Sequence, residues 1–91
     1  MKIELTLHAE KRIAVREMNR EQVIQVALMP EQDVTPEGEL PIAQSRIVFM
    51  GKEALMRVVF YDDEEVRWIV TAHITTQVKR YWQEESEKHE D

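Results

Sequence analysis

The chain of 91 residues has no cysteine, only two glycines and only three prolines. The absence of cysteine excludes disulfides, thiolate metal sites and cysteine nucleophiles, and it suits the reducing cytoplasm in which we expect the protein to reside. No GxGxxG or P-loop motif is present, which excludes the glycine-rich cradles that hold nucleotide phosphates. We therefore expect no cofactor.

Long apolar runs are also absent. No window approaches the roughly 20 apolar residues that cross a bilayer, and the opening sequence MKIELTLHAEKR lacks the uninterrupted apolar stretch of a secretory signal. Neither membrane residence nor export is expected. The length predicts a single domain over residues 1–83, because so short a chain cannot bury two cores.

Positive charge is scarce, since 12 Lys and Arg stand against 18 Asp and Glu, a net charge of -6. Residues 84–91 carry five acids and one lysine, a net of -4, so residues 1–83 hold the remaining -2. An acidic total disfavours a nucleic-acid binder, but the nearly neutral body leaves room for local basic patches. Apolar residues vanish after Trp82, so we expect the acidic tail 84–91 to be disordered.

Two helices are predicted in the first third of the chain. Residues 6–18, TLHAEKRIAVREM, contain neither Gly nor Pro, and Thr6 is available as an N-cap. A second helix is expected from about Arg20 to Leu28, because Asn19 opens a capping-box pattern and Pro30 cannot continue a helix.

After a proline-rich loop at 30–41, the periodicity becomes that of strands. The runs SRIVFM, ALMRVVFY and VRWIVTAHI, with turns near Gly51 and Asp62, predict an antiparallel meander. Strict alternation in the third run places Trp68 and His73 on opposite faces of the sheet.

Two further extended pieces are predicted, at Lys2–Leu5 and around Val34. The last run, TTQVKRYW, predicts a short helix. The fold class is therefore α+β, with two N-terminal helices packed on a three- to four-stranded antiparallel sheet and a short C-terminal helix.

Three stretches carry a resemblance to a known family. HAEKR places Arg12 four residues after His8, QSRIVFMGKEAL fits a hairpin, and LMRVVFYDDEEVRWIVTAHITTQVKRYW covers residues 55–82. Together they resemble a family of small bacterial domains of unknown function, distantly related to the RelE/ParE and BrnT toxins of toxin-antitoxin pairs. The resemblance covers residues 5–82. It departs from the family pattern at His73, where Tyr is more frequent, and in its acidic balance.

The resemblance implies a RelE-like fold, RNA as substrate and a cognate antitoxin as partner. A metal-independent endoribonuclease needs a base for the 2′-hydroxyl, cations for the phosphate charge and an acid for the leaving oxygen. The catalytic candidates are His8, Arg12, Arg57, His73, Arg80 and Tyr81, and Arg16 and Lys79 are candidates for binding nucleic acid. No spacing among them identifies a mechanism.

Several of these residues have a plain structural alternative. His8, Arg12 and Arg16 form either a phosphate-facing stripe or a solvated helix face. Arg57, in an apolar strand, points either into a cleft or past the sheet edge. The face that carries His73 either holds a ligand or meets solvent.

The pair of cations and pair of aromatics at 79–82 also has two interpretations. The rings could stack on bases while Lys79 and Arg80 meet phosphate. Alternatively, Val78 and Trp82 pack on the sheet and leave the cations in water.

No metal site is expected, because His8, His73 and His89 have no metal-binding spacing. The alternative to an RNA-acting toxin or its inactive relative is a non-catalytic protein-interaction domain, which would bind another protein, or itself through a sheet edge.

Overall fold

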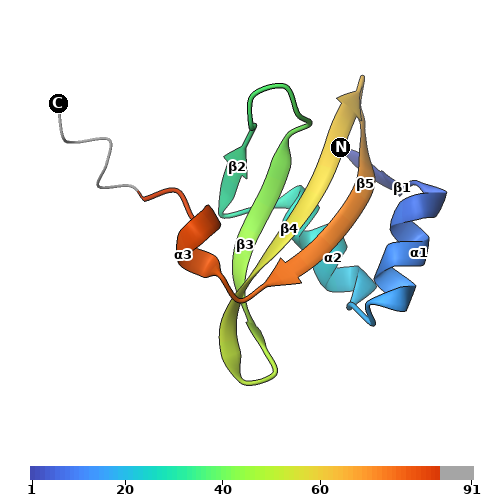
Figure 1. Cartoon of the computed structure of the whole chain (residues 1–91). Coiled ribbons are helices and arrows are strands. Elements are labelled where there is room, and N and C mark those ends of the chain that lie inside the picture. Colours follow the sequence, from blue (N-terminus) through green and yellow to red (C-terminus); the bar gives the residue numbers. More distant parts are fainter. Residues whose placement is uncertain (85–91) are drawn as a thin grey trace, which may run out of the picture.

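The computed structural model describes residues 1–84, which form an α+β fold with one sheet and three helices (Figure 1). The elements in chain order are β1 (Lys2–Leu5), α1 (Leu7–Val15), α2 (Arg20–Leu28), β2 (Gln32–Val34), β3 (Ile42–Phe49), β4 (Lys52–Asp63), β5 (Val66–Thr75) and α3 (Val78–Tyr81). Of the predicted acidic tail 84–91, all but Glu84 lies outside the described residues. No helix among residues 1–84 is long and apolar enough to cross a membrane.

The sheet has five strands in the order β1-β5-β4-β3-β2. The predicted antiparallel meander is present as β3, β4 and β5. The prediction of a three- to four-stranded antiparallel sheet is wrong, because β2 pairs with β3 at one edge and β1 pairs in parallel with β5 at the other. The sheet is mixed because β5, the strand most distant from β1 in sequence, lies between β4 and β1 and runs parallel to β1.

The caps predicted for the two long helices are confirmed. The Thr6 hydroxyl accepts a hydrogen bond from the Ala9 amide at 3.1 Å, and the Asn19 side chain accepts one from the Gln22 amide at 3.0 Å. The second helix has the predicted bounds.

The first helix ends three residues earlier than predicted, at Val15. Glu17 takes a left-handed conformation, with φ 54°. The amide of Met18 then donates to the carbonyl of Ile13, and the amide of Glu17 donates to that of Ala14. This is the Schellman arrangement, which satisfies the last helical carbonyls and stops the helix.

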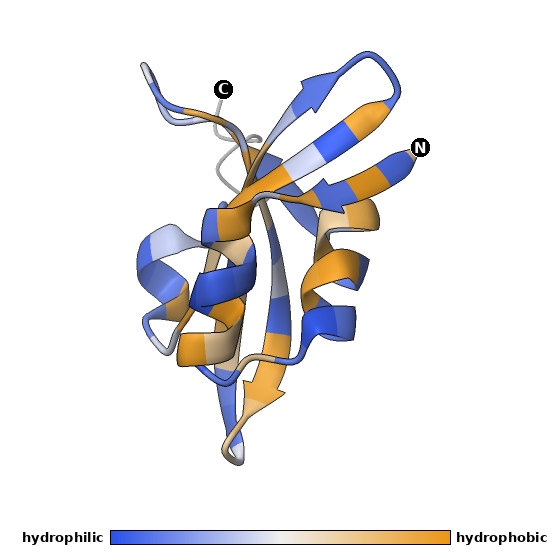
Figure 2. Ribbon diagram, turned by 90° about the vertical axis from the view of Figure 1, so that its right-hand side faces the viewer, coloured by the Kyte–Doolittle hydropathy of each residue, from blue (hydrophilic) through white to orange (hydrophobic). Residues whose placement is uncertain are grey.

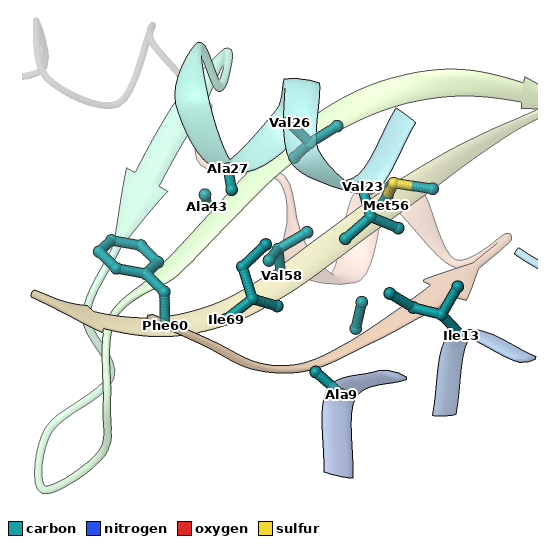
Figure 3. Packing of buried hydrophobic residues seen from close by; sticks show 11 residues of the cluster. Ala9, Ile13, Val23, Val26, Ala27, Ala43, Met56, Val58, Phe60 and Ile69 are labelled. Atoms are coloured by element: carbon teal, nitrogen blue, oxygen red, sulfur yellow. The ribbon is translucent and has the colours of Figure 1, made fainter. Parts of the chain in front are cut away.

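The core lies between the sheet and the two long helices (Figure 3). It contains Ala9, Ile13, Val23, Val26, Ala27, Ala43, Met56, Val58, Phe60, Ile69 and Ala72. In β4 these are every second residue, so Leu55, Arg57, Val59 and Tyr61 belong to the opposite face. The opposite face is where the short helix α3 packs, against β4.

A β-bulge in β5 changes which side chains share that face. Val59 pairs with Thr71, but the next residue of β4, Phe60, pairs with Ile69, so Val70 has no partner. Trp68 pairs with Tyr61 and His73 pairs with Arg57. Since partners across a ladder share a face, the prediction that Trp68 and His73 lie on opposite faces is wrong.

The hairpin that joins β3 to β4 projects from the body (Figure 1). Met50 and Gly51 form its two-residue turn with φ values of 53° and 77°, as a type I′ turn requires. Apolar residues continue to this tip (Figure 2), where Val48 is 78% and Met50 86% exposed.

Candidate functional site

A row of polar side chains crosses four strands on the sheet face opposite the two long helices. The register pairs Gln32 of β2 with Gln44 of β3, Gln44 with Arg57 of β4, and Arg57 with His73 of β5. The two middle members are buried, with Gln44 fully covered and Arg57 9% exposed. Buried polar side chains need partners, and their partners define the site.

Arg57 is held by an amide and an aromatic ring. Its Nε donates to Oε1 of Gln44 at 3.0 Å, and its guanidinium carbon lies 4.1 Å from the centre of the Tyr81 ring. Among the described residues, no ion pair joins Arg57 to a carboxylate. Burial lowers its pKa, while Tyr81 and Glu39 act in the opposite direction. A buried cation without a counter-ion is costly and is a recurrent feature of anion sites.

Arg57 lines a pocket of about 630 Å³. The pocket lies between the β2 segment and α3 and is lined by Glu31, Gln32, Asp33, Val34, Thr35, Pro36, Arg57, Tyr81 and Gln83. Arg57 is its only cationic side chain among the described residues. Arg57 thus lies at a cleft and does not extend past the edge of the sheet.

Gln44 ties α3 to the sheet. Its Nε2 donates to Oε1 of Gln32 at 2.8 Å and to the carbonyl of Tyr81 at 3.1 Å. Gln32 in turn bonds the backbone of Gln83 twice, donating to its carbonyl at 2.6 Å and accepting from its amide at 3.0 Å. The two glutamines therefore fix the position of Tyr81 over Arg57.

His73 lies beside Arg57 on β5 and is partly buried. Burial lowers its pKa from the ordinary 6.5, and the charges of Arg57 and Arg16 lower it further. The imidazole is therefore neutral at pH 7 and can accept a proton. A second pocket, of about 440 Å³, is lined by Arg16, Met18, Phe49, His73 and Ile74.

Arg16 follows α1 and reaches the uncovered edge of β5. Its Nη1 donates to the Ala72 carbonyl at 2.6 Å. Thus it is separated from His8 and Arg12, which remain together on the exposed face of α1, where Nε of Arg12 donates to Nε2 of His8 at 3.4 Å. The predicted stripe of three is broken because the helix ends at Val15.

The final cations and rings divide between the sheet and solvent, and neither Val78 nor Trp82 belongs to the buried core. The Trp82 ring lies 4.2 Å from the guanidinium of Arg46, which is paired with Glu31. Lys79 and Arg80 are exposed, and the guanidinium of Arg80 lies 5.4 Å from the centre of the Tyr81 ring. Tyr81 therefore has a cation on its strand side and a second one at longer range.

The structure brings five of the eight predicted residues to one region. Arg57, His73, Tyr81 and Arg80 are linked by register or by ring contacts, and Arg16 joins them through the His73 pocket. Lys79 is adjacent on α3. His8 and Arg12 belong to the helical layer on the other side of the sheet.

Gln32 and Gln44 were not predicted as site residues. The sequence shows only that Gln44 follows two apolar residues at the start of β3, Ile42 and Ala43. A glutamine in a strand is usually solvated, so only the register across β2, β3 and β4 shows that these side chains meet.

The chain matches no protein-family model, no curated protein and no solved structure. The resemblance to the RelE/ParE and BrnT toxins therefore stays a prediction. Within residues 1–84, no cluster of three or more His, Asp or Glu side chains could hold a metal ion.

Proposed function

We propose that this chain has a RelE-like fold and binds and cleaves RNA as a metal-independent endoribonuclease, the toxin of a toxin-antitoxin pair. The alternative within the same family is an inactive relative, which would keep the fold without the cleavage. The observation that carries the proposal is the buried Arg57, which has no carboxylate partner within residues 1–84, stacks on the Tyr81 ring and is the cross-strand partner of His73, whose imidazole is neutral at pH 7. The three side chains supply the cation, acid and base that such cleavage needs.

Each residue has a distinct role in the proposed reaction. His73 takes the proton of a 2′-hydroxyl, whose oxygen attacks the adjacent phosphorus. The bond from phosphorus to the 5′-oxygen breaks, and Tyr81 gives the leaving oxygen its proton. Arg57 stabilises the charge that develops on the phosphoryl oxygens. The products are a 2′,3′-cyclic phosphate and a 5′-hydroxyl, and the proton count balances.

The exposed cations extend the site rather than perform the chemistry. Arg80 and Lys79 lie on the solvent side of α3, next to Tyr81, where they can contact neighbouring phosphates. Arg16 lies on the other side of His73. Phosphate contacts of this kind make binding depend on salt.

The test is cleavage of a short single-stranded RNA by the purified protein in the presence of EDTA. We expect Arg57→Gln and His73→Gln each to lower kcat by about 100-fold or more, and Tyr81→Phe to lower it while leaving α3 in place. Lys11→Gln, on the exposed surface of α1, is the matched control and should cleave like the parent. Intact RNA and undisturbed growth on expression of the parent would remove the proposal.

A second candidate function is a non-catalytic protein-interaction domain. It is favoured by the hairpin tip, where Val48 and Met50 are 78% and 86% exposed and where Met50 holds a positive φ that non-glycine residues rarely adopt. Association with a protein partner that tolerates high salt, and that is lost in a Val48→Ser, Met50→Ser double variant, would support this function. This function also requires that the parent protein does not bind RNA.

A further inference from the structure

Two aromatic side chains lie side by side on the sheet face that carries Arg57 and His73. Tyr61 and Trp68 are direct partners across β4 and β5. Tyr61 is 39% exposed, and Trp68 is partly exposed. Large aromatic surfaces that stay in contact with solvent, beside a candidate site, are typical of binding surfaces.

The bulge at Val70 is what joins the aromatic pair to the polar row. Trp68 and His73 are five residues apart, so a regular strand would place them on opposite faces. Because Val70 has no partner in β4, both side chains lie on the face opposite the long helices. Bulges of this kind often redirect side chains next to active sites.

Three successive cross-strand pairs then follow one another along β4 and β5. They are Arg57 with His73, Val59 with Thr71, and Tyr61 with Trp68. Tyr61 lies four positions along β4 from Arg57, a distance of roughly 13 Å. A cation and an imidazole thus stand at one end of a short track, and two rings stand at the other.

Charge along this track is mixed, and Arg57 is its one candidate for holding a phosphate among the described residues. Arg57 has no carboxylate partner there, but its pocket is also lined by Asp33 and by Glu31, which is paired with Arg46. Beside the rings, Glu4 pairs with Trp68 across β1 and β5 and is bound to Lys2 at 3.1 Å. The acidic turn at 63–65 lies beyond the rings and repels phosphates, so the track fits phosphate at Arg57 and bases at the rings.

We propose that unpaired bases of single-stranded RNA stack on Tyr61 and Trp68 while a phosphate further along the same strand is held by Arg57. The proposal rests on the proposed RNA function and adds to it the requirement for a single strand, because paired bases do not offer their faces to side chains. Stacking does not depend on base identity, so the site selects strandedness more than sequence.

The test uses a fluorescently labelled 2′-deoxy oligonucleotide, which cannot be cleaved because it lacks the attacking hydroxyl. We expect Tyr61→Leu and Trp68→Leu each to weaken binding by about 10-fold. Tyr61→Phe and Trp68→Phe keep a ring and are the matched controls, with binding within about threefold of the parent. Binding by the parent should also quench tryptophan fluorescence, and the Trp68→Phe variant should lose much of this quenching.

Salt dependence separates stacking from phosphate contact. The leucine variants should keep the parent's slope of log affinity against log salt, because the rings release no counterions. Arg57→Gln should reduce that slope. Leucine variants that bind as tightly as the parent would overturn the stacking proposal, and so would a surface that binds a protein and ignores the oligonucleotide.

The outcomes also distinguish this proposal from the proposed function. Ring-dependent binding of the oligonucleotide without cleavage of the matching RNA would leave the stacking surface in place and remove the catalytic role. Cleavage of RNA with an unchanged kcat/KM in the leucine variants would keep the catalytic role and remove the stacking surface. A parent protein that neither binds nor cleaves would remove both.

Discussion

Arg57 and Arg67 are the two partly or fully covered arginines of the sheet, and they are satisfied in different ways. Arg67 donates to both carboxylate oxygens of Asp62, at 2.7 and 2.9 Å, and to the Ala27 carbonyl at 2.8 Å. Its guanidinium also lies 3.8 Å from the centre of the Phe60 ring. Arg57 has a ring and one amide oxygen instead. The first arrangement stabilises the fold, and the second leaves binding capacity unused.

Replacement of Arg67 by methionine should destabilise the protein. The change leaves the carbonyl of Ala27 without its side-chain donor and removes a two-point pairing with Asp62, so we expect the free energy of unfolding to fall by about 2 kcal/mol. Urea unfolding followed by circular dichroism measures it. Arg20→Met breaks an exposed pair with Glu10 and is the control, with a much smaller effect. Equal losses in both variants would contradict the role given to Arg67.

His73 should make stability depend on pH in a predictable direction. Its pKa is lowered in the folded state below the ordinary 6.5, so the unfolded chain binds the proton more readily and stability falls as the pH drops below about 6.5. The loss in stability between about pH 7.5 and pH 5.5 should be larger in the parent than in His73→Gln. Urea unfolding at the two pH values tests this. The same loss in both proteins would show that burial and the two arginines do not perturb His73.

At the scale of elements, α3 depends on contacts with distant strands. It has only four residues and no side-chain N-cap hydrogen bond, so its own propensity cannot hold it. Gln44 and Gln32 bind the carbonyl of Tyr81 and the backbone of Gln83 from the sheet. The position of the Tyr81 ring is thus a property of β2 and β3.

Gln44→Met should therefore release α3. Methionine has a similar volume but cannot bond Arg57, Gln32 or Tyr81, so we expect faster hydrogen exchange at residues 78–83 and a loss of about 2 kcal/mol in unfolding free energy. Gln25→Met, on the exposed surface of α2, is the control. If exchange in α3 is unchanged in the Gln44 variant, the glutamines do not hold the helix.

Local signals predicted the elements well where the chemistry is local. The caps Thr6 and Asn19 mark where the two long helices begin, and each acts through a hydrogen bond to an amide three residues later. The second helix also has the predicted end, at Leu28. The Schellman ending at Glu17 and the bulge at Val70 were missed, because neither Gly nor Asn marks the left-handed residue and a bulge leaves no periodic trace. The buried glutamine row was missed because it exists only once four strands are in register.

At the scale of the whole molecule, charge is distributed unevenly along the chain. Residues 84–91 contribute -4 of the net -6, and the last described backbone contact, from Gln32 to Gln83, lies at the pocket beside Arg57. Negative charge tethered close to a cationic site lowers its attraction for phosphates over about 10 Å at 0.1 M salt.

A form that ends at Gln83 should bind RNA more tightly than the full chain. The truncation removes a net charge of -4 and keeps the hydrogen bonds between Gln32 and Gln83, so affinity should rise several-fold at low salt and much less at moderate salt. Fluorescence anisotropy with one labelled RNA at both salt concentrations measures it. Equal affinity of the two forms at low salt would show that the acidic segment does not act on the site.

The parallel pairing of β1 with β5 also bears on how the chain acquires its structure during synthesis. Residues 2–5 pair only with residues 66–69 among the described strands, so β1 cannot form its ladder until β5, more than 60 residues later in the chain, has been synthesised. The apolar face of α1 also remains uncovered until then, because α1 packs chiefly on β5. Long-range pairings of this kind slow folding. The nascent chain therefore carries β1 unpaired until β5 has emerged.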